Sequence, residues 1–166
     1  MNKKGFTLIE LLIVLALIGI LTTVTVLALM NARQKTRDAE RVSQVSQIRA
    51  GLELGFAELA SYPTQTESDV VLGAGGNTLC EVKGAAAFVA DAASCTGTVF
   101  MSAVPSSPTP KDGKCATMQN AYRYLAGSGG TNFKVEFCLG KSPARSGLAD
   151  GLNCITPAGI APGACK

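Results

Sequence analysis

The chain begins with an apolar stretch of unusual length, followed by a longer region of mixed polarity. Between Phe6 and Met30, Glu10 is the one ionisable side chain. As a helix these residues span about 37 Å at ~1.5 Å per residue, enough to cross a hydrocarbon core of ~30 Å. A cleaved secretory signal peptide has a shorter apolar core of about 7–15 residues and a small-residue cleavage site after it. The pattern therefore predicts a retained transmembrane helix over 6–30.

A second pattern indicates that this helix continues beyond the membrane. Apolar residues recur at steps of three or four, with charged and amide side chains between them, which is typical of an amphipathic helix. The positions are Val42, Val45, Ile48, Leu52, Phe56 and Leu59. Ser61-Tyr62-Pro63 should end the helix, because proline disfavours helical backbone in the residue before it. We expect residues 31–62 to pack one stripe on a domain formed by residues 63–166.

The third region, residues 63–166, has weaker periodicity. Gly73–Asn77 and Pro105–Pro110 are rich in turn residues, so we expect 63–112 to be a loop region, with a short alanine-rich helix at 84–93. In 113–139, two alternating stretches flank the Gly127–Gly130 turn and predict a β-hairpin with Phe133, Val135 and Phe137 on one face. Residues 140–166 lack periodicity and are expected to be a C-terminal loop with a short strand.

Six cysteines change this picture, because all of them follow the apolar segment. None has CxxC spacing and the chain contains no histidine, which argues against a zinc site. An even number of cysteines beside an export signal indicates three disulfides and an oxidising compartment. Pairing of sequence neighbours, one of 15 connectivities, would give Cys80–Cys95, Cys115–Cys138 and Cys154–Cys165.

The cysteines also bear on membrane orientation. Lys3 and Lys4 precede the apolar stretch, whereas four basic residues follow it at Arg33, Lys35, Arg37 and Arg41. A plain count of these charges would put the C-terminus inside. The disulfide argument favours the opposite orientation, with the C-terminus outside the cytoplasmic membrane.

Candidate chemistry is sparse. Without histidine, neither a Ser-His-Asp nor a Cys-His nucleophile can form, and no phosphate-binding GxxxxGK[ST] loop occurs, so the chain is not expected to be an enzyme. We expect no cofactor or metal. Scattered acids offer calcium only as a weak alternative to solvated loop residues: Glu67, Asp69, Asp91, Asp112 and Asp150. Basic residues are interrupted by acids and glycines, so no specific nucleic-acid partner is predicted.

Glu10 is the anomaly of the apolar stretch, because a carboxylate there usually marks a partner. Together with the basic tail ending at Gly5 and the run Phe6-Thr7-Leu8-Ile9-Glu10-Leu11-Leu12-Ile13-Val14, it resembles the class III leader and N-terminal helix of type IV pilins and type II secretion pseudopilins. The resemblance implies a leader at 1–5, cleavage between Gly5 and Phe6 by prepilin peptidase, and N-methylation of Phe6. Glu10 would then meet the new amino group of a neighbouring subunit and set its register.

The resemblance also implies the fold and the partners. The expected fold is α+β and pilin-like, with one long helix packed on a small antiparallel sheet and an ectodomain linked by disulfides. The expected function is that of a structural subunit of a type IV pilus or pilus-like filament, first anchored in the cytoplasmic membrane and then part of an extracellular filament. Its partners would be copies of itself, the peptidase, and an inner-membrane assembly platform with its ATPase.

Two other functions stay open at this point. One is the major pseudopilin of a type II secretion system. The other is a single-span membrane protein whose ectodomain binds a ligand, which predicts neither cleavage after Gly5 nor a polymer. An anchored extracellular enzyme is disfavoured by the residue inventory.

Overall fold

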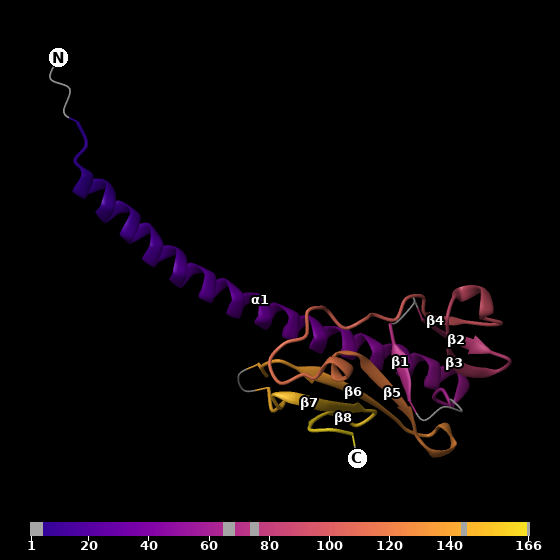
Figure 1. Ribbon diagram of the computed structural model, residues 1–166. Coiled ribbons are helices and arrows are strands. Elements are labelled where there is room, and N and C mark those ends of the chain that lie inside the picture. Colours follow the sequence, from indigo (N-terminus) through magenta and orange to yellow (C-terminus); the bar gives the residue numbers. More distant parts are fainter. Residues whose placement is uncertain (1–4, 65–68, 74–76, 144–145, 166) are drawn as a thin grey trace.

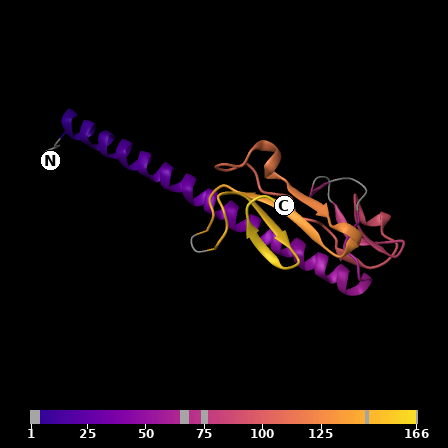
Figure 2. The ribbon, with the colours of Figure 1, turned by 90° about the horizontal axis from the view of Figure 1, so that it is seen from below.

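The structure is a computed structural model that describes residues 5–64, 69–73, 77–143 and 146–165 (Figure 1). Within these described residues, one long helix, α1 (Leu8–Leu59), precedes eight strands and three short 3-10 turns. The N-terminal half of α1 projects away from the rest, and the C-terminal half is covered by the strands (Figures 1 and 2). The predicted α+β architecture is confirmed.

Helix α1 is continuous over 52 residues, or about 78 Å at ~1.5 Å per residue. It ends at Ala60, whose left-handed backbone (φ 53°) lets its N–H donate to the carbonyl oxygen of Phe56 at 2.8 Å. This is a common way to satisfy carbonyl groups in the last turn of a helix. The prediction that the helix extends through Leu59 is confirmed.

The strands form two antiparallel sheets. The larger sheet has the order β1-β5-β6-β7-β8 and the smaller sheet the order β3-β2-β4. The strands of the larger sheet are β1 (Val70–Leu72), β5 (Tyr122–Ala126), β6 (Phe133–Leu139), β7 (Gly151–Thr156) and β8 (Gly159–Pro162), and those of the smaller are β2 (Thr78–Val82), β3 (Ala85–Val89) and β4 (Val99–Met101). Both sheets contact α1, the smaller through β2, β3 and β4 and the larger through β6 and β7.

The core lies between α1 and the sheets. Val45, Ile48 and Leu52 of the predicted helix stripe are almost fully buried, and Val42 and Phe56 are partly buried against the same cluster. Phe133, Val135 and Phe137 are fully buried, so the predicted face of the hairpin is confirmed. The sheet also contributes Tyr122, Tyr124, Leu139 and Ile155.

Two glycines allow the smaller sheet to approach the helix closely. A Cβ added to Gly51 would lie 2.9 Å from Cε of Met101, and one on Gly55 would lie 3.3 Å from the ring of Phe100. Both partners belong to β4, so this strand lies directly on α1.

Three expectations for the ectodomain are wrong. Residues 63–112 are not a loop region, because they contain β1 to β4. The expected helix at 84–93 is instead strand β3 followed by a 3-10 turn, since pairing with β2 and burial of Ala86 and Phe88 outweigh the high intrinsic helix propensity of alanine. Lys83 and Gly84, with φ of 51° and 81°, form the turn that this hairpin requires.

The C-terminal segment is the third correction. Residues 140–166 were expected to be mostly loop, but β7 and β8 form a second hairpin, and β7 extends the sheet by pairing with β6. In the expected hairpin at 113–139, strands occupy only 122–126 and 133–139. Residues before Tyr122 form a loop with a 3-10 turn (Thr117–Asn120).

Candidate functional site

The N-terminal half of α1 exposes an apolar surface that a folded protein does not normally leave in water. Phe6 and Leu8 are 78% and 81% exposed, and large apolar side chains remain exposed through Met30. Among the described residues, one helix, α1, is long and apolar enough to cross a membrane. Surfaces of this kind mark contacts with lipid or with other chains.

Glu10 caps the start of this helix. Its carboxylate accepts hydrogen bonds from the backbone N–H of Thr7 at 2.9 Å and from the Thr7 hydroxyl at 2.7 Å. The Thr7 hydroxyl in turn accepts the backbone N–H of Glu10 at 3.3 Å, which completes a capping box. The predicted site residues Gly5, Phe6 and Glu10 therefore lie together at the exposed end of α1, with the carboxylate engaged by its own helix.

A second polar site holds the ectodomain to the covered half of α1. Arg41 is completely buried on the inner face of the helix. Its Nη1 lies 2.8 Å from Asp38 and 3.1 Å from Asp112, and its Nη2 donates to Asn120 at 3.0 Å. The remaining acceptors lie in the loop before Asp112: the Ser107 hydroxyl and the carbonyl oxygens of Pro108 and Pro110. We call Asp38, Arg41 and Asp112 the buried charge cluster.

Each acid of this cluster joins α1 to a different loop. Asp38 accepts the backbone N–H groups of Gly140 and Lys141, both at 2.9 Å, at the end of β6. Asp112 also receives a two-pronged ion pair from Arg37. The hydrogen bonds from Arg37, and then those from Arg41, hold the pKa of the Asp112 carboxyl below its usual value, although partial burial opposes them. The cluster thus fixes the ectodomain at one height on α1.

The sequence analysis missed this cluster, because its predicted stripe began at Val42, Arg41 was counted only as a basic residue after the apolar stretch and Asp112 only as a scattered acid. A signal was nevertheless present. Asp38, Arg41, Val45, Ile48 and Leu52 are spaced by three, four, three and four residues. The two charges therefore continue the buried stripe towards the membrane.

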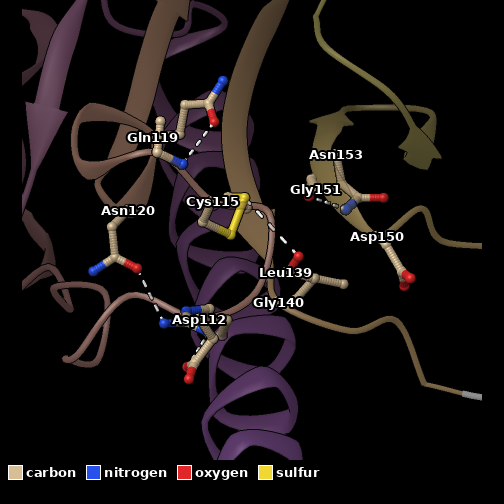
Figure 3. Close-up of a disulfide and its surroundings, with 12 residues drawn as sticks. Asp112, Cys115, Gln119, Asn120, Leu139, Gly140, Asp150, Gly151 and Asn153 are labelled. Carbon is tan, nitrogen blue, oxygen red and sulfur yellow. Dashed lines mark hydrogen bonds and ion pairs between the residues drawn. A yellow bond between two sulfur atoms is a disulfide. The ribbon is translucent and has the colours of Figure 1, made fainter.

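Three disulfides link the ectodomain: Cys80–Cys95, Cys115–Cys138 and Cys154–Cys165. These are the pairs of sequence neighbours. Cys115–Cys138 ties the loop that carries Asp112 to strand β6, and Figure 3 shows Asp112, Asn120 and Gly140 around this disulfide, next to α1.

The scattered acids considered for calcium do not converge. Asp112 pairs with arginines, Asp69 forms an ion pair with Arg123, Asp91 caps a 3-10 turn and Asp150 accepts the N–H of Ser142. Glu67 lies outside the described residues. In the part of the chain that the structure describes, no group of three or more potential ligands among His, Cys, Asp and Glu could hold a metal ion.

The arrangement defines a class of fold: a pilin-like α+β protein, with one helix that is apolar and exposed in its first half and packed on disulfide-linked antiparallel sheets in its second. Comparison with known proteins agrees. Residues 1–26 match the family model for the prokaryotic N-terminal methylation motif. This match confirms the predicted prepilin-type N-terminus.

The chain is also similar to individual proteins of known role. A fimbrial protein of Pseudomonas aeruginosa is 34% identical over 85 residues, covering 49% of this chain and 55% of the relative. The type II secretion system core protein G of Dickeya chrysanthemi is 29% identical over 63 residues, covering 38% and 41%. The corresponding protein of Escherichia coli K12 is 29% identical over 66 residues, covering 40% and 46%. The chain thus spans about half the length of the curated relatives it matches. No solved structure matches.

Proposed function

We propose that this protein is a structural subunit of a type IV pilus or pilus-like filament, polymerised through the first half of α1. The observation that carries the proposal is the exposed apolar half-helix ending in the Phe6–Glu10 segment. This surface can serve twice, as a membrane anchor before assembly and as the filament core afterwards. Repeated head-to-tail contacts between copies then give an open helical assembly.

The proposal includes processing and placement. Prepilin peptidase would cleave between Gly5 and Phe6 and methylate the new amino group, and an inner-membrane platform with its ATPase would drive assembly. The ectodomain would lie outside the cytoplasmic membrane, as three disulfides favour. The proposed role is structural, and the likeness to a fimbrial protein and to a type II secretion core protein supports it.

A major pseudopilin of a type II secretion system is the second candidate, and the likeness to core protein G favours it. Both candidates require the same cleaved, methylated N-terminus. Deletion of the gene in its host separates them: loss of surface filaments supports the pilus, and loss of protein secretion with filaments intact supports the pseudopilus.

The first test is the intact mass and the N-terminal sequence of the protein taken from membranes under non-reducing conditions. A chain that starts at Phe6, about 14 Da heavier for one methyl group and without six thiol hydrogens, supports the proposal. A chain that still starts at Met1 would support a single-span binding protein instead.

A further inference from the structure

The inference begins at the turn where α1 leaves its apolar half. Four basic residues follow Met30, but the folded structure uses two of them internally. Arg37 pairs with Asp112, and Arg41 is buried in the charge cluster. Arg33 and Lys35 are exposed and form no ion pair with any residue that the structure describes.

These two charges lie at a defined height. Arg33 and Lys35 are three and five residues beyond Met30, which places them about 4.5 and 7.5 Å further along the axis. The headgroup region occupies roughly 5–7 Å on each side of the hydrocarbon core. If Met30 marks the edge of that core, both side chains lie among the lipid headgroups.

The ectodomain brings a third cation next to Lys35. Lys141, in the loop after β6, and Lys35 line a hollow of about 590 Å³ together with Asp38, Ala39, Ser142 and Pro143. They also share a smaller hollow of about 150 Å³ with Asn31 and Gln34, in the first turn after the apolar segment. The β6–β7 loop lies at the end of the ectodomain nearest the free half of α1 (Figure 1).

The buried charge cluster explains why Lys141 is there. Asp38 accepts the backbone N–H of Lys141, so the residue is held against α1 while its side chain remains exposed. A third hollow, of about 360 Å³, is lined by Arg33, Asn31, Gln34 and Arg37 on α1, together with Met30, Pro110 and Asp112. Where the ectodomain meets the exposed half of α1, cations therefore lie on more than one side of the helix.

The acids near this surface offset only part of its positive charge. Asp38 lines the larger hollow, but it is 1% exposed and matched by Arg41. Asp112 is engaged by Arg37 and Arg41. Asp150 is an exposed carboxylate whose pKa is lowered by hydrogen bonds from Ser142 and, to a lesser extent, by the charges of Lys114 and Lys141, so it offsets part of the positive charge of Lys141. Glu40 lies exposed on α1, where it accepts from Gln44.

We propose that Lys35 and Lys141 bind the phosphate of an anionic phospholipid. Arg33, which lines a different hollow on another side of α1, adds positive charge close to the same height but does not contact this phosphate. The position of both lysines at the membrane surface favours a lipid over a soluble anion. Their positive charges complement the negative charge of a lipid phosphate. The walls formed by Ala39 and Pro143 suit the glycerol part of the headgroup. The proposal depends on α1 crossing a membrane and does not depend on filament assembly.

The test uses the full chain, reconstituted at low density in phosphatidylcholine vesicles that carry a trace of spin-labelled lipid. The association of spin-labelled phosphatidylglycerol is compared with that of spin-labelled phosphatidylcholine by electron spin resonance. We expect the wild type to prefer phosphatidylglycerol severalfold, with an upper limit of roughly fivefold for each lysine. In the double variant Lys35→Gln/Lys141→Gln the ratio should fall towards unity.

Matched variants separate a specific site from net charge. Lys83→Gln/Lys134→Gln also removes two charges, from the β2–β3 turn and the far end of β6, and should keep the preference. Lys35→Arg/Lys141→Arg should keep it too. The single variant Lys35→Gln, on an exposed face of α1, should lower the preference for phosphatidylglycerol even if the double variant folds poorly.

Several results would overturn the proposal. These are equal association of the two lipids with the wild type, an unchanged ratio in the double variant, or the same loss in the control pair. Displacement by free inorganic phosphate but not by chloride of equal ionic strength would assign the site to a soluble anion. A preference that changes with protein density would assign it to a second copy of the chain. None of these results depends on whether the protein polymerises.

Discussion

At the scale of single residues, Arg41 decides how α1 meets the ectodomain. A buried guanidinium is costly unless its N–H groups have acceptors, and here carboxylates, carbonyls, an amide and a hydroxyl provide them. Hydrophobic packing alone would let a smooth helix slide or rotate against a sheet. The directional bonds of Arg41 give the contact one register.

Replacing Arg41 by methionine should therefore be strongly destabilising, because the buried carboxylate of Asp38 would lose its ion-pair partner and Asp112 would be left with Arg37 alone. We expect a loss of about 3–5 kcal/mol in the free energy of unfolding. The measurement is denaturant unfolding of the full chain in detergent, followed by the near-ultraviolet circular dichroism of its three buried tyrosines. Arg33→Met, at an exposed position, should change the free energy of unfolding by less than about 0.5 kcal/mol. Equal stability of the two variants would contradict a structural role for the cluster.

Asp112 makes the same cluster sensitive to acid. Its pKa is lowered in the folded protein, chiefly by the hydrogen bonds from Arg37. The unfolded chain therefore binds more protons near pH 4, and acid favours unfolding. This stabilisation is fully present above about pH 4 and is lost as the pH falls below it.

Asp112→Asn should lower stability at pH 7 and make the acid side of the stability profile shallower. Unfolding midpoints of the variant and the wild type, measured in denaturant at pH 7, 5 and 3, would show both effects. Asp150, whose pKa is also lowered, leaves some acid dependence in the variant. A profile with the same slope as the wild type would rule Asp112 out as the titrating group.

At the scale of elements, the loop from Ser102 to Ala121 has no regular strand and depends on its anchors. One anchor is the charge cluster and the other is the Cys115–Cys138 disulfide. A disulfide that closes a loop of this size contributes roughly 3 kcal/mol in the chain-entropy model. Its local effect is to hold Asp112 close to α1.

Cys115→Ser/Cys138→Ser should therefore expose this loop to trypsin. Lys111 and Lys114 are already exposed side chains on it, so cleavage is limited by how far the backbone can open. We expect much faster cleavage after these two lysines, identified by mass spectrometry of the fragments. Cys154→Ser/Cys165→Ser removes a disulfide from β7 and the C-terminus and should leave that rate close to the wild type. Similar acceleration in both variants would show that the anchoring is not local.

The elements that sequence patterns predicted are those whose side chains repeat with one period. Phe133, Val135 and Phe137 alternate, and Val45, Ile48 and Leu52 follow a helical repeat, so both faces could be read from the chain. Strand β3 is three alanines, a phenylalanine and a valine, which helix propensity describes as well as strand pairing does. Strand β7 has buried Gly151, Asn153 and Cys154, so no apolar alternation marks it. The charge cluster was hidden because Asp112 is 71 residues from Arg41.

At the scale of the whole molecule, the two halves of α1 have separate tasks. The second half gives the ectodomain a fixed height, and the first half presents an apolar rod that no part of its own described ectodomain covers. Because α1 is one continuous helix of 52 residues, the position of one half sets the position of the other. Subunits stacked through the rod would therefore present their ectodomains at a regular spacing.

Glu10 tests this assembly, because the structure gives it a local role that must be separated from the proposed contact between subunits. Its carboxylate caps its own helix through Thr7, and an alanine at this position would remove both the cap and the charge. Glutamine can take the same place in a capping box but carries no charge. The pair of variants Glu10→Gln and Glu10→Ala therefore distinguishes the two roles.

If Glu10 meets the amino group of Phe6 on a neighbouring subunit, the charge is essential. Glu10→Gln should then assemble as poorly as Glu10→Ala, while both remain in the membrane and are cleaved after Gly5. Filament yield by electron microscopy, with N-terminal sequencing of the membrane fraction, measures this. Normal filaments from Glu10→Gln together with few from Glu10→Ala would mean that assembly needs the start of the helix to be ordered and not the ion pair. Normal filaments from both would remove Glu10 from the assembly mechanism and leave the apolar rod to set the register through packing alone.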